Sequence, residues 1–311
     1  MIIKKMIKDF IAGIPAKHIN RAGRLLGNIA YSFDVRHRRI VRRNLKFAYP
    51  EWTWSQVQKT TRHVFQNLFI TLFEILQLTC FSKEDVLSRV KIKGEENIEK
   101  YMAKPEGIVM ISLHLGNWEF VPHFITCYFN RIAASVARQV KPYILNTFIH
   151  RYRTGFGCEI LYKKKIFPEM RKTIRDGKIL GILIDQGTSL SKGMEVNFFG
   201  KTVTATPAAA LLAMRHHCPV IPVFCKREDD ASLTIVIDKP LKLQRTGNLR
   251  SDLHTNTQIM TSAIEKIIRD YPEQWLWMHK RWKRHYPQLY PEDIKKRLRN
   301  KKKRQQGRLK S

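Results

Sequence analysis

The sequence predicts an α/β protein with a central, mostly parallel sheet flanked by helices and a helical N-terminal section. Apolar runs at residues 107–113 and 179–184, which read GIVMISL and ILGILI, indicate buried strands. Helical patterns lie between such runs, and this alternation is typical of an α/β layer structure. With 311 residues, 43% of them hydrophobic, the chain can bury a sizeable core.

The first residues predict an amphipathic helix over residues 1–16. Apolar side chains recur at helical spacing from Ile2 to Ile14, and the charged residues among them fall on the opposite face. Such a helix suits a membrane interface, and it equally suits a terminal position packed on the core. No run in the sequence approaches the roughly 18 apolar residues that a membrane-spanning helix needs.

Residues 17–95 are predicted to form a helical front section. One helical region covers residues 17–49 and contains an apolar stripe from Leu25 to Phe33, followed by a dense basic run. Two more helices are expected at residues 55–65 and 68–79.

Residues 96–290 are predicted to form the α/β part. Strands are expected at residues 107–113, 132–137, 160–162, 179–184, 220–224 and 233–237. Helices are expected at residues 120–130, 145–154, 168–176, 207–217 and 255–270, and Gly177 caps the third of these. Both sections belong to one domain, 17–290, and the basic residues of 291–311 predict a disordered cationic tail.

The composition is strongly basic, since 57 Lys and Arg against 26 Asp and Glu give a net charge of +31. Nucleic acid, anionic lipid and an acidic carrier protein all qualify as partners. A nucleic-acid-binding protein is therefore one candidate class, although we find no zinc-ligand spacing, helix-turn-helix signal or RNP-type motif. The five cysteines are far apart and form no C-x-x-C pair, which predicts reduced thiols and a cytoplasmic protein.

The sharpest local signal is the segment from His114 to Glu119, which directly follows the first apolar strand. Gly116 and Asn117 supply a turn, and Asn117 suits the N-cap of a helix that carries Glu119 in its first turn. The turn would bring both side chains together at the carboxyl end of a central strand, where open α/β sheets bind ligands. A neutral histidine oriented by a carboxylate is a general base for a hydroxyl. Taken alone, the pair also fits an ordinary structural histidine.

Several segments, in order along most of the chain, resemble the lipid A biosynthesis lauroyl/myristoyl acyltransferase family. They are Arg42-Arg43-Asn44-Leu45, Phe73-Glu74, the H-x-G-x-W-E form of residues 114–119, Asp185-Gln186, Phe198-Phe199-Gly200 and the aromatic, basic segment 272–283. The resemblance implies a fold like that of glycerolipid acyltransferases and makes 17–290 an acyltransferase domain. It implies transfer of a fatty acyl group from acyl carrier protein to a hydroxyl of a lipid A precursor, with His114 as general base and Glu119 orienting it.

The resemblance also implies the partners and the setting. Besides acyl carrier protein, whose bound fatty acid is a co-substrate, no cofactor and no metal are expected. Anionic membrane lipid and the glycolipid acceptor are the other expected partners, without nucleic acid. The expected location is the cytoplasmic face of the bacterial inner membrane, with peripheral or interfacial attachment. A different glycolipid or an aminolipid is the alternative acceptor.

Further site residues fall into three groups. The oxyanion or substrate-positioning candidates are Arg153, Asp185, Asn117 and Gly116, and Asp185 fits either the site, an N-cap or a structural partner of Arg153. The substrate-binding candidates are Arg138, Asn146, Gln186, Phe198, Phe199 and Thr204. The candidates for membrane or phosphate contact are Arg42, Arg43, Trp275, Trp277, Arg281 and Trp282, whose tryptophans suit an interfacial belt or a helix packed over the sheet.

Overall fold

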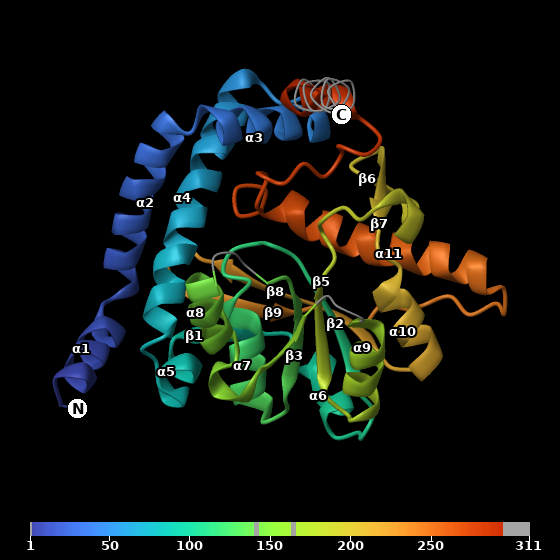
Figure 1. The fold of residues 1–311 in the computed structure, drawn as a ribbon, viewed down its shortest axis with the longest axis horizontal. Coiled ribbons are helices and arrows are strands. Elements are labelled where there is room, and N and C mark those ends of the chain that lie inside the picture. The colour runs from blue at the N-terminus through green and yellow to red at the C-terminus, as the bar shows by residue number, and fades with distance from the viewer. Residues whose placement is uncertain (1, 140–142, 163–165, 295–311) are drawn as a thin grey trace, which may run out of the picture.

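A seven-stranded sheet forms the centre of the protein in a computed structural model that describes residues 2–139, 143–162 and 166–294 (Figure 1). The strand order is β1-β9-β8-β2-β5-β3-β4. Every neighbouring pair is parallel except β8 and β9, which confirms the predicted fold class. The strands are β1 (Val90–Lys93), β2 (Ile108–Ser112), β3 (Ala133–Ala137), β4 (Glu159–Tyr162), β5 (Ile179–Leu183), β8 (Val220–Arg227) and β9 (Leu233–Ile237).

The predicted strands all correspond to strands of this sheet, and three strands were not predicted. Strand β1 was missed because its four residues alternate Val and Ile with two lysines, a weak signal at a sheet edge. It lies inside the section 17–95, which is therefore not wholly helical. The other two, β6 (Met194–Phe198) and β7 (Lys201–Ala205), form a separate antiparallel hairpin.

The front section contains α1 (Ile2–Gly13), α2 (Ala16–Phe33), α3 (Val35–Ala48) and α4 (Trp54–Leu78). The helical region predicted at 17–49 is two helices, because Asp34 separates them and its side chain accepts a hydrogen bond from the His37 amide. The helices predicted at 55–65 and 68–79 are one, α4, since neither Gly nor Pro interrupts the sequence between them.

Helices cover both faces of the sheet. They are α5 (Lys83–Ser88), α6 (Glu96–Met102), α7 (Phe120–Phe129), α8 (Tyr143–Arg153), α9 (Ile166–Arg175), α10 (Ala208–His216) and α11 (Leu249–Asp270). Strand β2 is buried on both sides, with Ile108 and Met110 in the core that holds α7, and Val109 and Ile111 in the core that holds α10 and α11. Helix α11 begins before the predicted residue 255 because Asn248 caps it by accepting a hydrogen bond from the Ser251 amide.

The segment after α11 returns across the sheet and is buried. Trp275, Trp277 and Trp282 are each at most 1% exposed, and Arg281 is 2% exposed. Their predicted contact with a membrane is therefore wrong, because the tryptophan rings pack against Phe198 and Phe199 inside the protein. Among the described residues, no helix combines the length and the apolar character needed to cross a bilayer. The predicted tail, 291–311, lies outside the described residues from 295 onward.

Candidate active site

The site begins where two neighbouring parallel strands end. Strands β2 and β5 pair in register, with Ser112 opposite Leu183, so the residues that follow them emerge at the same sheet edge. There His114 Nδ1 lies 2.9 Å from Asp185 Oδ1. The His114 amide donates to Asp185 Oδ2 at 2.9 Å, and Trp275 Nε1 donates to the same oxygen at 2.8 Å. Asp185 is thus fixed on both oxygens and holds His114 by backbone and ring.

These contacts determine the protonation of Asp185 and His114. Burial alone would raise the pKa of Asp185, but its attraction to His114 and its hydrogen bonds hold that pKa below its ordinary value. Burial alone would lower the pKa of His114, and the Asp185 carboxylate outweighs it so that the pKa is raised. An ionised carboxylate only accepts, so Nδ1 carries the hydrogen. In the neutral ring Nε2 is then the basic atom, and it lies 3.3 Å from Gln186 Nε2.

Glu119 has a different partner. Arg153 Nε donates to Glu119 Oε2 at 2.9 Å, and Arg153 Nη2 bonds to Oε1 as well, so the pair is bidentate. The prediction that Glu119 orients the His114 ring is therefore wrong, and so is the alternative that Asp185 pairs with Arg153. The reason is that Glu119 directly precedes α7, whereas Asp185 emerges from the adjacent strand and takes Nδ1. Glu119 and His114 nevertheless line one cavity.

The turn between His114 and Glu119 requires glycine. Gly116 has φ +54°, and a Cβ there would lie 2.0 Å from the Cys225 carbonyl oxygen. The Gly116 amide donates to the Gln274 carbonyl, and the Asn117 amide donates to the Cys225 carbonyl. Both amides are thus occupied, which leaves Arg153 of the predicted oxyanion donors. The predicted N-cap role of Asn117 is also wrong, since its side chain instead donates to Glu74 Oε2 at 3.0 Å.

A buried ion pair supports this turn from behind. Arg227, at the end of β8, donates through Nε to Glu74 Oε1 at 2.9 Å, and both side chains are shielded from solvent. On the same helix, α4, Thr71 donates to the Gly116 carbonyl at 2.9 Å. Sequence reasoning noted Glu74 and missed Arg227. The available signal was a basic residue that ends an otherwise buried strand.

A cavity of about 660 Å³ opens at His114. Its inner wall is largely apolar and includes Met110, Val121, Val136, Ile160, Ile166, Met170 and Ile182. Its cations are Arg138, Arg153 and Lys192. Of the predicted substrate-binding residues, Arg138 and Gln186 therefore line the cavity.

The remaining predicted substrate-binding residues lie elsewhere. Phe198 and Phe199 are buried in the aromatic core, and Thr204 Oγ1 lies 3.0 Å from His285 Nε2. All three are absent from the cavity wall, as is Asn146, which lies on α8. The structure therefore contradicts the prediction that Phe198 and Phe199 bind substrate.

Gly181 marks the interior of this cavity. A Cβ at this position would be 3.5 Å from Met110 Cε and 3.4 Å from Ser135 Oγ, which is close to ordinary contact. The hydroxyl of Ser112, on the same wall, is buried without a hydrogen-bond partner in the described residues. The absence of a side chain at Gly181 therefore leaves room between β2 and β3 that a larger residue would fill.

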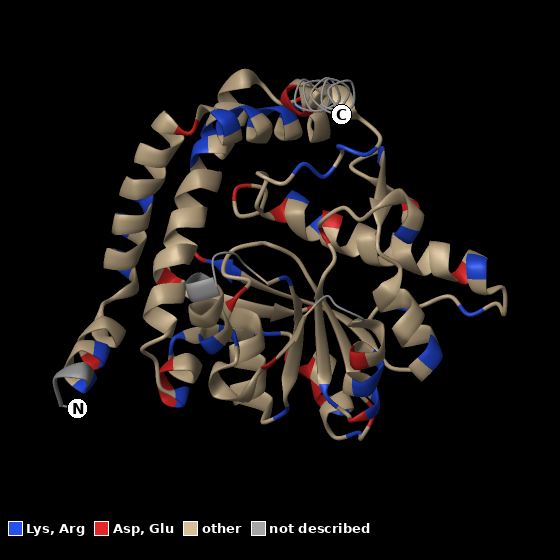
Figure 2. Ribbon diagram, viewed as in Figure 1, with Lys and Arg blue, Asp and Glu red and all other residues tan. Residues whose placement is uncertain are grey.

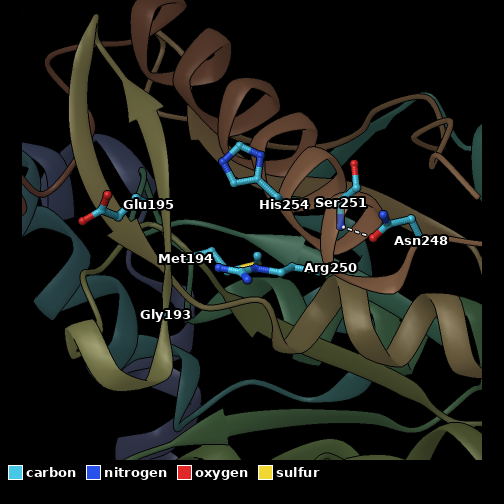
Figure 3. Close-up of a pocket in the computed structure, with 7 residues that line it drawn as sticks. All are labelled: Gly193, Met194, Glu195, Asn248, Arg250, Ser251 and His254. Carbon is cyan, nitrogen blue, oxygen red and sulfur yellow. Dashed lines mark hydrogen bonds between the residues drawn. The ribbon is translucent and has the colours of Figure 1, made fainter. Parts of the chain in front are cut away.

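A second hollow lies between β6 and the start of α11 (Figure 3). It is lined by Gly193, Met194, Glu195, Asn248, Arg250, Ser251 and His254. Its polar side chains are exposed, and Asn248 already caps α11. It therefore lacks the enclosed, oriented groups found at His114.

Arg42 and Arg43, the predicted phosphate contacts, have partners within the protein. Arg42 Nη2 donates to the Tyr31 hydroxyl at 2.8 Å, and Arg43 Nη1 donates to Glu292 Oε2 at 2.8 Å. Both side chains are only partly exposed and are used within the protein. In the part of the chain that the structure describes, no group of three or more His, Cys, Asp or Glu residues could hold a metal ion.

Sequence comparison identifies the family to which this site belongs. Residues 5–284 match the bacterial lipid A biosynthesis acyltransferases, which is most of the chain. The chain belongs to this family. The protein is therefore an acyltransferase, and the histidine at the mouth of an apolar cavity lies in a lipid A acyltransferase fold.

Similarity to individual relatives of this acyltransferase family is distant but extends over most of the chain. A lipid A biosynthesis lauroyltransferase of Escherichia coli (strain K12) is 23% identical over 283 residues, 88% of each protein. A lipid A biosynthesis acyltransferase of Haemophilus influenzae is 21% identical over 236 residues, 76% of this chain and 72% of that protein. A phosphatidylinositol mannoside acyltransferase of Mycolicibacterium smegmatis is 23% identical over 180 residues, 57% of each.

Proposed function

We propose that this acyltransferase moves a fatty acyl group from acyl carrier protein to a hydroxyl of a lipid A precursor, at the cytoplasmic face of the bacterial inner membrane. The observation that carries the proposal is the 2.9 Å contact between His114 and Asp185 at the mouth of an apolar cavity. The names of the Escherichia coli and Haemophilus influenzae relatives support lipid A as the acceptor class.

In the proposed reaction, His114 is the base. With Nδ1 donating to Asp185, Nε2 takes the proton of the acceptor hydroxyl as its oxygen attacks the thioester carbonyl. The acceptor O–H bond breaks and the new C–O bond forms. The C–S bond then breaks, and the imidazolium returns the proton to the leaving sulfur. Asp185 stabilises the intermediate imidazolium, and Gln186 gives way so that the hydroxyl reaches Nε2.

Arg153 is the proposed oxyanion donor, with Glu119 as the residue that positions it. The guanidinium lines the cavity, and Glu119 fixes two of its nitrogens. Its pKa is raised by the hydrogen bond and charge of Glu119, which outweigh the opposing effect of burial, so it stays charged. A fixed donor of this kind contributes about 10²- to 10³-fold to the rate.

The lining of the cavity suits both the fatty acyl chain and the charged groups of the proposed substrates. Its apolar wall suits a fatty acyl chain, and its volume lies within the range of about 300–1,000 Å³ typical of ligand sites. Arg138 and Lys192 line the cavity, and both are exposed. These cations suit the phosphates of a glycolipid and an acidic carrier protein. Nucleic acid has no part in the proposal.

A donor and acceptor assay tests the proposal. The purified protein is given acyl-acyl carrier protein together with a lipid A precursor, and products are read by mass spectrometry. We expect acylated lipid A precursor, and none with His114→Ala, whose folding is checked by circular dichroism. Transfer from coenzyme A thioesters alone would contradict the proposed donor. Failure to acylate the precursor, with another acceptor used instead, would contradict the proposed acceptor.

A second acceptor class is favoured by one observation. The phosphatidylinositol mannoside acyltransferase of Mycolicibacterium smegmatis matches 57% of the chain. A glycosylated phosphatidylinositol, or another glycolipid or aminolipid, is therefore the alternative acceptor. The same assay with both lipids present separates them, because competition reveals which is acylated faster.

A further inference from the structure

Helix α2 packs on α4 through its glycines. A Cβ on Gly23 would lie 2.6 Å from Ile70 Cα, and a Cβ on Gly27 would lie 2.5 Å from Gln66 Cα. The two helix backbones therefore touch, and they run side by side in Figure 1. Small residues four apart at a helix contact are typical of helices that pack in lipid, where the larger apolar residues face outward.

Most of the larger apolar residues of α2 do face outward, whereas Ile19 is buried. Leu25 is 62% exposed, Ile29 45% and Phe33 83%. Their spacing of four residues places them along one face of the helix, which we call the α2 stripe. Leu26 is exposed beside them, and Phe10 on α1 is exposed as well. A run of large apolar side chains on the outside of a folded protein indicates a surface that binds something.

Basic side chains border the α2 stripe. Lys17, Arg21 and Arg24 are exposed, and a rotation of about 100° per residue places them together on one side of the stripe. Helix α2 contains no Asp or Glu, and Figure 2 shows blue and no red along it. An apolar strip edged by cations is complementary to an anionic bilayer surface. Two copies of this face would instead bring like charges close to one another.

We propose that the exposed face of α2 is a membrane-docking surface for an anionic lipid bilayer. Leu25, Ile29 and Phe33 enter the boundary between headgroups and acyl chains, while the bordering cations bind lipid phosphates. The proposal rests on the membrane location proposed above and names the surface responsible. It replaces the buried tryptophans as the interfacial contact, and Gly23 and Gly27 hold this face rigidly on the body of the enzyme.

Vesicle binding tests the proposal with a matched control. Leu25→Gln/Phe33→Gln removes two exposed apolar residues from the α2 stripe, and Ile132→Gln/Leu249→Gln removes two from elsewhere. Co-sedimentation uses vesicles of phosphatidylcholine with phosphatidylglycerol. We expect the α2 variant to bind at least about tenfold more weakly than the wild-type protein, and the control variant to bind like it. Lys17→Gln/Arg21→Gln/Arg24→Gln should lose most of the dependence on phosphatidylglycerol.

The outcomes separate this proposal from the proposed reaction. The α2 variant should retain acyl transfer to a detergent-dispersed acceptor within about twofold, because Leu25 and Phe33 are exposed and do not line the cavity. Unchanged vesicle binding by the α2 variant would overturn the docking surface, and so would a change in oligomeric state on gel filtration with vesicle binding intact. If the α2 variant loses vesicle binding and the wild-type protein shows no acyl transfer, the docking surface is upheld and the proposed reaction is rejected.

Discussion

Glu119 is bound by the guanidinium of Arg153 and leaves the ring of His114, five residues earlier, to Asp185. The two carboxylates thus have separate tasks in one cavity. Asp185 holds the proposed base, His114, and Glu119 holds the proposed oxyanion donor, Arg153. Substitution of the two carboxylates should therefore affect the kinetics in different ways.

Asp185→Asn should lower kcat by about 10²- to 10⁴-fold and move the pH profile. Asp185 raises the pKa of His114, and the base works when the ring is neutral, so wild-type activity should rise with pH through that raised pKa. Without the carboxylate the pKa falls, and the rising limb should move to lower pH. Profiles of kcat/KM against pH measure this, with Asp176→Asn, an exposed carboxylate, as control. An unmoved limb would show that Asp185 does not set the basicity of His114.

Glu119→Gln and Arg153→Lys should each reduce kcat by about 10²-fold, and the double variant should be little worse than either. Non-additivity is expected because both changes break the same bidentate contact. Steady-state kinetics of the four proteins give the coupling. The exposed pair Lys172 and Asp176 provides a control cycle, which should show no effect on kcat. Strictly additive losses at Glu119 and Arg153 would mean that the two residues act separately.

Gly181→Val should shift acyl-chain preference toward shorter donors. The new side chain would fill the space beside Met110 and Ser135, so long chains should lose at least about tenfold in kcat/KM while short chains lose little. A series of acyl-acyl carrier proteins of increasing chain length measures the shift. Gly13→Val, at an open position, should leave the preference unchanged. Equal losses for all lengths would indicate that the acyl chain does not reach Gly181.

Arg227→Met should destabilise the protein by about 3–5 kcal/mol, because it leaves the Glu74 carboxylate buried and unpaired. Adding Glu74→Leu should restore most of the stability without restoring activity, since Asn117 in the catalytic turn then lacks its acceptor. Chemical denaturation and acyl transfer measure the two effects. Arg43→Met breaks a half-exposed pair and should cost only about 0–1 kcal/mol. If activity recovered together with stability, Glu74 would not be needed to position Asn117.

Six strands of the central sheet and the catalytic turn were predictable because their signals are local. The run 107–113 is apolar enough to be buried, and Gly116, which favours a turn, lies between His114 and Glu119 directly after it. The partner of His114 was not predictable in the same way. It depends on β5 being the neighbour of β2, and strand order is set by packing between segments far apart in the sequence.

The aromatic segment shows a second limit. Trp275 and Trp282 lie among basic residues, a pattern that fits a membrane interface and a buried layer alike. The structure decides for burial, because Phe198 on the β6 and β7 hairpin packs against both rings. Sequence periodicity found the apolar residues from Leu25 to Phe33, but which side of α2 faces α4 depends on Gly23 and Gly27.

Helix α4 is a single rod of 25 residues that touches both α2 and the catalytic turn. Gln66 contacts the glycine side of α2, and Glu74 binds Asn117 about 12 Å further along the axis, at about 1.5 Å per residue. An enzyme bound to the membrane through α2 would therefore hold His114 at a fixed distance from the lipid headgroups. Acceptors would then be sorted by how far their reactive hydroxyl projects from the bilayer, whatever the chemistry of the sugar that bears it.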